Sequence, residues 1–221
     1  MKVLIIGDVM GKPGRDAMKE FKKKKKNDYD FVIVNGENAA AGFGITPKIA
    51  DEFFELGVDV ITSGNHIWDK KELYSYLNEN KNILRPLNYP KGVPGFGYTI
   101  KENGKGDKIA VINIQGRVFM PEVDSPFQRI EEAIEEIKKE TKNIIVDFHA
   151  EATSEKLAMG WYLDGRVSAV YGTHTHVQTA DERILEKGTG FINDVGMTGS
   201  HDSIIGMTIE TVLPKFLTSL P

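Results

Sequence analysis

Residues 2–38, KVLIIGDVMGKPGRDAMKEFKKKKKNDYDFVIVNGEN, contain two short apolar runs separated by a polar, lysine-rich stretch. The runs Lys2–Ile6 and Phe31–Val34 are rich in β-branched residues and are followed by polar residues, so they predict buried strands. Between them, Gly14–Lys26 predicts a helix. A strand, a helix and a second strand in this order are typical of a parallel pair joined by a right-handed crossover.

The same order continues downstream. Thr46-Pro47 predicts a helix start, because threonine caps a helix N-terminus and proline is tolerated in the first turn. That helix is expected to end at Leu56, and Val58–Thr62 predicts a third strand. A further helix is expected after His66, to about Leu77.

The rest of the chain predicts a mixed sheet. Tyr98–Lys101 and Ile109–Ile114 flank the turn Asn103-Gly104 as a hairpin. The remaining predicted elements are, in order, a helix over 125–140, a strand over 143–148, a short helix from Ser154, a strand over 168–171, short strands at 184–185 and 191–192, and a closing helix over 208–217 that Pro214 is expected to kink or divide. Together these elements predict the α/β class, with mixed β-sheets flanked by helices in a single domain over residues 1–221.

Composition limits the chemistry. The chain has 221 residues and no cysteine, which excludes disulfides, thiolate zinc sites and cysteine nucleophiles. Any metal must therefore bind to His, Asp, Glu or Asn, a set of ligands that suits iron, manganese or zinc. The N-terminal run is too short for a signal peptide, and no apolar run approaches the ~20 residues that a membrane span needs, so we expect a cytoplasmic protein with no membrane partner.

The charge balance argues against a broad nucleic-acid surface. The formal net charge is -4, whereas general binding to nucleic acids needs a wide basic field. One basic run, Lys22–Lys26, either binds a phosphate polymer or forms the solvated end of a helix, where lysine complements the helix dipole. We favour the helix end.

Polar clusters follow the predicted strands. Because ligands bind beyond the carboxyl ends of strands in open α/β sheets, we expect these clusters to converge on one place: Asp8, Glu37-Asn38, Asn65-His66, His149 and His174-Thr175-His176. Taken singly, most of them have an ordinary alternative as a turn former, a helix cap or a hydrogen-bonded core histidine. The His-x-His pair is more specific, because alternate residues of an extended chain point the same way.

As metal ligands, these carboxylates, amides and histidines are too many for one ion with an open site. They fit two ions about 3.5–4 Å apart with one carboxylate bridging them. Two such ions activate a water molecule, orient the resulting hydroxide and neutralise charge on a phosphoryl oxygen. Phosphoester hydrolysis has these requirements.

The chain resembles the calcineurin-type metallophosphoesterases in the blocks Gly7-Asp8, Gly64-Asn65-His66, His149 and Gly172-Thr173-His174-Thr175-His176. Longer segments resemble the bacterial YmdB-like branch, and this likeness covers nearly the whole chain: GDVMGKPGR (7–15), NGENAA (35–40), GNHIWD (64–69) and DVGMTG (194–199). The broad superfamily has a histidine where this chain has Met10 and a bridging aspartate where it has Glu37. The YmdB-like pattern has both changes, and Asn38 is then the replacement ligand.

The resemblance implies a four-layer αββα sandwich and a dimetal phosphodiesterase. The implied substrates are small cyclic nucleotides, above all 2′,3′-cyclic ones, cleaved by in-line attack of a metal-bridging hydroxide. It implies two sets of ligands, with iron as the usual metal: Asp8, Glu37, Asn38 and His176 for one ion, and Glu37, Asn65, His149 and His174 for the other. His66 is the expected general acid, and Asp69 is a candidate to orient it.

Substrate contacts are less sharply defined by the sequence. Arg117 either contacts phosphate or forms a surface salt bridge, and the candidates for a nucleobase contact are aromatic: Phe43, Trp68 and Phe119. His201 is expected at the pocket rim or on the surface.

Two other functions stay open at this point. One is a non-catalytic regulator that binds a nucleotide or RNA through the same metal centre, and the other is a different two-metal hydrolase such as an amidohydrolase. We also expect a homo-oligomer. YmdB-like chains usually continue past the final helix, so this domain is expected to lack some of their C-terminal strands.

Overall fold

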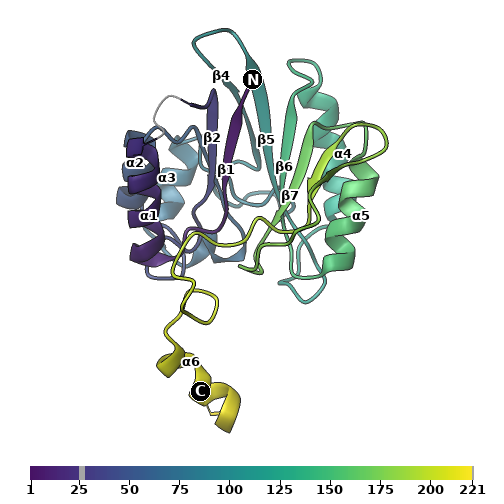
Figure 1. Cartoon of the computed structure of the whole chain (residues 1–221). Helices are drawn as coiled ribbons and strands as arrows, with labels where there is room; N and C mark the ends of the chain where they lie inside the picture. The colour runs from purple at the N-terminus through teal and green to yellow at the C-terminus, as the bar shows by residue number, and fades with distance from the viewer. Residues whose placement is uncertain (25–27, 221) are drawn as a thin grey trace.

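Two β-sheets face each other, and helices cover the outer face of each, in the computed structural model of residues 1–24 and 28–220 (Figure 1). Sheet 1 is three-stranded and parallel, and its order is β1 (Val3–Ile6), β2 (Phe31–Asn35) and β3 (Val60–Thr62). Sheet 2 is six-stranded, and its order is β4 (Tyr98–Glu102), β5 (Lys108–Gln115), β6 (Ile144–His149), β7 (Ala169–Thr173), β9 (Gly190–Ile192) and β8 (Arg183–Ile184). Its outer pairs β4–β5 and β8–β9 are antiparallel, and the other pairs are parallel.

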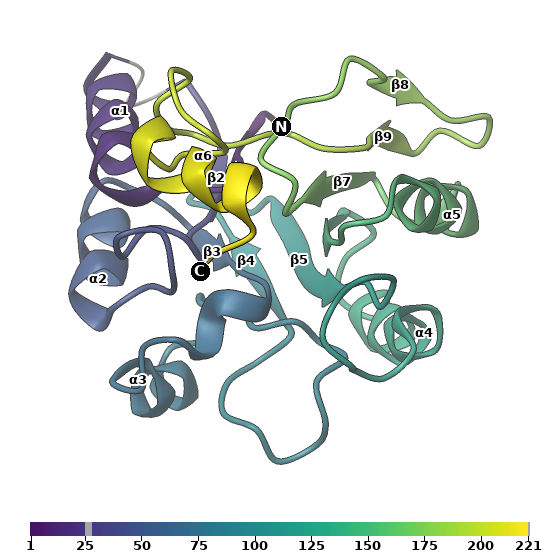
Figure 2. The same cartoon turned by 90° about the horizontal axis from the view of Figure 1, so that it is seen from below.

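The helices complete four layers. Sheet 1 is covered by α1 (Gly11–Lys24), α2 (Pro47–Glu55) and α3 (Leu73–Glu79), and sheet 2 by α4 (Pro126–Ile137) and α5 (Thr153–Leu163) (Figures 1 and 2). The predicted α/β class with mixed sheets is confirmed, and so is the αββα order. The last helix, α6 (Ile209–Thr218), lies below the sheets in Figure 1 and has no buried side chain. It continues through Pro214 instead of dividing there. Among the described residues, no helix is both long and apolar enough to cross a membrane.

Local sequence explains where α1 and α2 start, and the structure shifts the predicted start of α1. Thr46 caps α2 as predicted, because its Oγ1 accepts a hydrogen bond from Ile49 N at 3.3 Å. By contrast, α1 begins at Gly11, before the predicted Gly14, because Pro13 falls in the first turn, where a missing N–H group leaves no hydrogen bond unmade.

The helix predicted from His66 to Leu77 is also divided. A 3₁₀ turn, η1 (Asn65–Trp68), comes first, and α3 follows after a short break. The i→i+3 bond from Asp69 N to His66 O, at 3.1 Å, is typical of the tighter turn. The side chain of Asp69 also contacts His66 across this turn, with Oδ2 2.8 Å from Nδ1 of the ring.

Alternation along the strands separates three hydrophobic clusters. In β2, Val32 and Val34 pack toward α1–α3, whereas Phe31 and Ile33 pack between the sheets. In β6, Val146 belongs to the cluster under α4 and α5. Both faces of these strands are therefore buried, which explains their continuous apolar runs.

Between the sheets, the side chains change from apolar to polar toward the carboxyl ends of the strands. The same inward faces that carry Ile33 and Ile145 go on to carry a fully buried polar layer, defined by Asn35, Thr62, Asn113, Asp147 and Thr173. Its hydrogen bonds cross from sheet to sheet, for example from Asn35 Nδ2 to Asp147 Oδ2 at 3.3 Å. The polar layer thus joins the two sheets at the carboxyl ends of their strands.

The lysine run does not form an open basic patch in its described part. Lys22 is buried against the end of α2, and Lys23 donates a hydrogen bond to Glu20 at 2.7 Å. Lys25 and Lys26 lie outside the described residues.

The segment 194–199 threads between the end of β1 and the end of β7. Thr198 N donates to Asp8 O at 2.9 Å, and Val195 N donates to Gly172 O at 3.0 Å. Gly7 makes this crossing possible, because a Cβ atom there would lie 1.9 Å from the backbone oxygen of Gly196.

We therefore expect Gly7→Ala to lower the free energy of unfolding by about 1–3 kcal/mol through overpacking. Gly104→Ala is the matched control, because nothing lies within 4 Å of a Cβ atom at that position. Urea unfolding measures both variants. Equal urea midpoints for the two variants would contradict the close approach of Gly7 to the backbone of Gly196.

Candidate metal centre

The polar clusters that follow the strands converge on one edge of the molecule, which Figure 2 views from below. Sheet 1 contributes residues that follow β1, β2 and β3, and sheet 2 contributes residues at the ends of β6 and β7. The side chains brought together are those named from the sequence: Asp8, Glu37, Asn38, Asn65, His149, His174 and His176.

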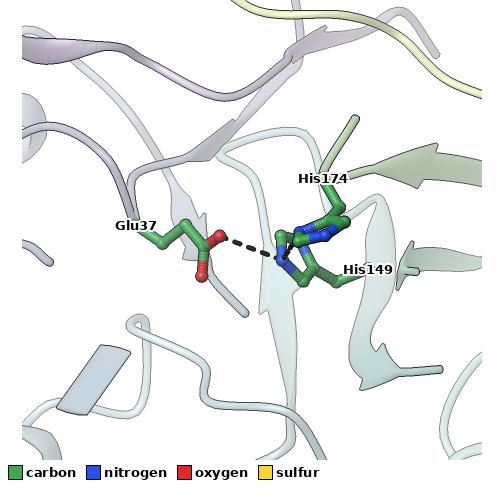
Figure 3. Close-up of side chains that lie close together, drawn as sticks. All are labelled: Glu37, His149 and His174. Carbon is green, nitrogen blue, oxygen red and sulfur yellow. Dashed lines mark hydrogen bonds and ion pairs between the residues drawn. The ribbon is translucent and has the colours of Figure 1, made fainter. Parts of the chain in front are cut away.

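One half of the site centres on Nε2 of His149. This atom lies 2.9 Å from Glu37 Oε1, 3.1 Å from His174 Nδ1 and 3.2 Å from Asn65 Oδ1. Figure 3 shows Glu37 facing the two histidine rings from the opposite sheet. Ligand atoms of Glu37, His149 and His174 all lie within 4.8 Å of one another, so they can hold a metal ion.

The other half contains Asp8, Asn38 and His176. His176 Nε2 lies 3.9 Å from Asp8 Oδ1. Asp8 Oδ1 and Asn38 Oδ1 are buried, and neither has a hydrogen-bond partner within residues 1–24 and 28–220. A buried acceptor left unpaired costs about 1–3 kcal/mol, and a cation bound by both oxygens would satisfy them. These residues therefore fit a metal ion of the hard or borderline type.

Each histidine is oriented by a polar contact on one ring nitrogen, which is a hydrogen bond for His149 and His176 and a close approach to a carboxylate for His174. The pairs are His149 Nδ1 with Thr173 Oγ1 at 2.9 Å, His174 Nε2 with Glu151 Oε2 at 3.1 Å, and His176 Nδ1 with Ile205 O at 2.9 Å. Such outer contacts fix the tautomer and the ring direction of metal-binding histidines. The remaining nitrogen of each ring is left for an ion.

The His-x-His segment is not extended, so strand alternation, the reason expected from the sequence, does not explain why its two histidines point to one site. The strand β7 ends at Thr173, and His174 and His176 have φ angles of 100° and 63°, so the segment is not extended. Positive φ in a residue other than glycine costs about 1–3 kcal/mol and persists only where the surroundings hold it. The two histidines serve one centre because of this bend, not because of strand alternation.

Beside the ligands lies a pocket of ≈ 320 Å³ that includes His66 and Phe43 in its walls. His66 Nδ1 is 2.8 Å from Asp69 Oδ2, and its backbone N–H donates to Glu37 Oε2 at 3.0 Å. The Phe43 ring meets the His66 ring edge to face, with centroids 5.0 Å apart. The structure thus brings His66, Asp69 and Phe43 together at the metal-ligand cluster.

Other sequence candidates lie outside this pocket lining. Trp68 is half-buried and packs edge to face with Tyr74 and Tyr89, and Phe119 is 90% exposed. Arg117 is exposed, and its backbone N–H bonds to Glu155. His201 lies exposed on a loop, within the range expected for it.

Comparison with known proteins identifies the family of this chain. A family model described as YmdB-like protein matches residues 4–221. The chain belongs to the YmdB-like family. It is 57% identical over 224 residues to the 2′,3′-cyclic-nucleotide 2′-phosphodiesterase of Bacillus subtilis, covering 100% of this chain and 84% of that protein.

Two crystal structures are similar to this YmdB-like chain. A hypothetical protein from Thermus thermophilus is 48% identical with a TM-score of 0.95, over 100% of this chain and 86% of the other. A phosphatase from Mycoplasma pneumoniae is 38% identical with a TM-score of 0.90, over 100% of this chain and 80% of the other.

Electrostatics in this YmdB-like site favour a bound cation. Burial tends to raise the pKa of Glu37, but the charge and the hydrogen bond of His149 outweigh it and lower that pKa to about 2. Burial tends to lower the pKa of His149, but Glu37, Asp8 and Asp147 together raise it to about 9. For Asp8, burial prevails over the nearby histidines and raises its pKa. A cation bound beside these carboxylates would stabilise their ionised forms.

Several residues that shape the centre were missed from the sequence. Glu151 follows His149 by two positions, and a carboxylate at that spacing was the available signal. Lys156 falls on the buried face of α5, with Met159, Gly160 and Leu163 at helical spacing, and a lysine on an apolar stripe is unusual. Its partner Asp194 lies on the segment that borders β7.

The buried pair Lys156–Asp194 holds the bent His-x-His segment. Lys156 Nζ lies 2.6 Å from Asp194 Oδ2, and both side chains are buried. The same oxygen accepts hydrogen bonds from Thr175 N at 3.3 Å and Thr175 Oγ1 at 2.7 Å. Thr175 is thereby fixed between the two histidines with positive φ.

Lys156→Met is expected to lower the free energy of unfolding by about 3–5 kcal/mol, because it leaves the Asp194 carboxylate buried without a counter-charge. Lys12→Met removes one partner of the exposed pair Lys12–Asp16 and is expected to change the free energy of unfolding far less, because solvent screens that pair. Urea unfolding of the two variants measures the difference. Similar small losses in both would show that the buried pair does not hold this segment.

Proposed function

We propose that this chain is a two-metal phosphodiesterase that hydrolyses small cyclic nucleotides, with 2′,3′-cyclic nucleotides as the first candidates. The observation that carries the proposal is the cluster of ligand atoms of Glu37, His149 and His174 within 4.8 Å of one another, beside buried Oδ1 atoms of Asp8 and Asn38 that have no hydrogen-bond partner among the described residues. The name of the Bacillus subtilis relative, a 2′,3′-cyclic-nucleotide 2′-phosphodiesterase, supports the class of substrate.

The proposed ligands divide between two ions that share Glu37. Asp8, Asn38 and His176 complete one set, and Asn65, His149 and His174 complete the other. We propose iron, with manganese or zinc as alternatives, since oxygen and imidazole ligands suit all three. When bound, two such metal ions would activate water and neutralise charge on the phosphoryl group.

His66 is the proposed general acid. Its Nδ1 is engaged by Asp69, which leaves Nε2 to donate a proton to the ribose oxygen that departs from phosphorus. Asp69 keeps the ring in one orientation, because carboxylate and imidazole are 2.8 Å apart. A side chain placed to donate a proton favours catalysis over a purely regulatory binding role. The names of the relatives, a phosphodiesterase and a phosphatase, favour a phosphoester substrate over an amide.

Phe43 is the proposed wall for the nucleobase. It is 47% exposed and lines the pocket together with Met10, Ile205 and Met207, so an aromatic base can lie against an apolar surface there. Direct phosphate contact by Arg117 is not part of the proposal, because Arg117 lies outside the pocket lining. The one-domain organisation, the cytoplasmic location and the homo-oligomeric state stay predictions from the sequence.

His66→Ala is expected to lower kcat for 2′,3′-cyclic AMP about 10²–10⁴-fold, because the leaving oxygen loses its proton donor. Metal content should be unchanged, since His66 is not a proposed ligand. His201→Ala, on the exposed loop, is the matched control and should retain wild-type kcat. Wild-type turnover by His66→Ala would remove this role, and an inactive metal-loaded wild type would remove the enzymatic proposal.

Elemental analysis tests the metal centre itself. Protein stripped by a chelator and reloaded with iron or manganese is expected to bind two ions per chain and to regain activity. Glu37→Ala should lose both ions, because its carboxylate belongs to both proposed sets. Glu122→Ala, at an exposed position, should load like the wild type. Fewer than two ions in loaded wild-type protein would count against a bridged site.

A further inference from the structure

Asp147 is a fully buried carboxylate with no part in the proposed chemistry. It lies on β6 within the polar layer between the sheets. Its hydrogen-bond donors are neutral: Thr62 Oγ1 and Asn35 Nδ2 donate to Oδ2, and Thr173 Oγ1 donates to Oδ1 at 2.7 Å. A buried carboxylate is costly to keep, so its position calls for a physical reason.

The hydrogen bonds of Thr173 lead from Asp147 to the metal centre. Thr173 has one hydroxyl proton, which it donates to Asp147, so its oxygen accepts from His149 Nδ1 at 2.9 Å. His149 then carries its proton on Nδ1, and its Nε2 faces Glu37 and His174. The order of donors and acceptors follows from the chemistry of a carboxylate and a hydroxyl.

The strand register explains why a hydroxyl group stands between carboxylate and imidazole. Asp147 and His149 are alternate residues on one face of β6, about 6.6 Å apart along the strand. His149 pairs with Thr173 on the neighbouring strand β7. Thr173 is therefore placed to bridge a gap that Asp147 cannot span directly.

Asp147 also bonds to the sheet that carries the opposing ligands. Thr62 ends β3 three positions before Asn65, and Asn35 ends β2 two positions before Glu37. Asn35 Oδ1 in turn accepts a hydrogen bond from the backbone N–H of Glu37 at 3.2 Å. One carboxylate thus contacts the strands that carry both sides of the centre.

We propose that Thr173 and Asp147 are positioning residues for the metal ion held by His149. They act through His149 by fixing its tautomer and ring orientation and by making Nε2 a stronger donor to the ion. This inference rests on the proposed metal centre and extends it to two residues that touch neither metal nor substrate.

Manganese binding to the intact, metal-stripped chain tests the inference. Thr173→Val removes the hydroxyl and is expected to weaken the binding of one ion about 10–100-fold, measured by titration against a competing chelator. Thr173→Ser restores the hydroxyl and should restore the affinity. Thr62→Val is the matched control, because it removes a different hydroxyl from Asp147 and leaves the path to His149 intact.

Stability separates a positioning role from a structural one. Thr173→Val and Thr62→Val should both lower the urea midpoint of the metal-free chain, since each leaves a buried partner without a hydrogen bond. Only Thr173→Val should weaken manganese binding. If the valine variant does not fold, Thr173→Ala, which adds no methyl group, gives the same comparison.

The inference is overturned if Thr173→Val binds both manganese ions like the wild type, or if Thr62→Val weakens binding equally. The proposed metal centre fails on a different result, namely a wild-type chain that binds neither manganese nor iron. Because the wild type and the variants are titrated side by side, the two failures are distinguishable.

Discussion

The metal centre depends on one buried contact between the sheets, in which Glu37 Oε1 lies 2.9 Å from His149 Nε2. Glu37 follows a strand of sheet 1, and His149 ends a strand of sheet 2. Among the described residues, no strand of one sheet pairs directly with a strand of the other. The distance between these atoms is therefore set by side-chain packing between the sheets, together with the segment 194–199, whose backbone bonds to the ends of both β1 and β7.

The composition of the interface changes along the strands in a way that serves the centre. In β6, the inward face carries Ile145, then Asp147 and then His149. In β2, Ile33 and Asn35 follow the same order before Glu37. Apolar burial thus holds the sheets together, directional hydrogen bonds fix their relative position, and the ligands emerge where that position is best defined.

Strain in the His-x-His segment is held from outside the sheets. His174 and His176 adopt positive φ angles, and Asp194 bonds to Thr175 between them. Lys156 on α5 supplies the counter-charge that allows a carboxylate to be buried there. A helix layer remote from the ligands therefore takes part in shaping them, which agrees with the general finding that strained backbone gathers at functional sites.

The sequence by itself determined the α/β class, most strand positions and the ligand types, because apolar runs and the polar residues after them are local features. It also located the cluster that follows each strand, since chain order dictates which residue comes next. Only the tertiary structure decided that Glu37 meets His149 and that Asp147 reaches it through Thr173. Those contacts depend on sheet packing and strand register, which join residues far apart in the chain and leave no periodic trace in it.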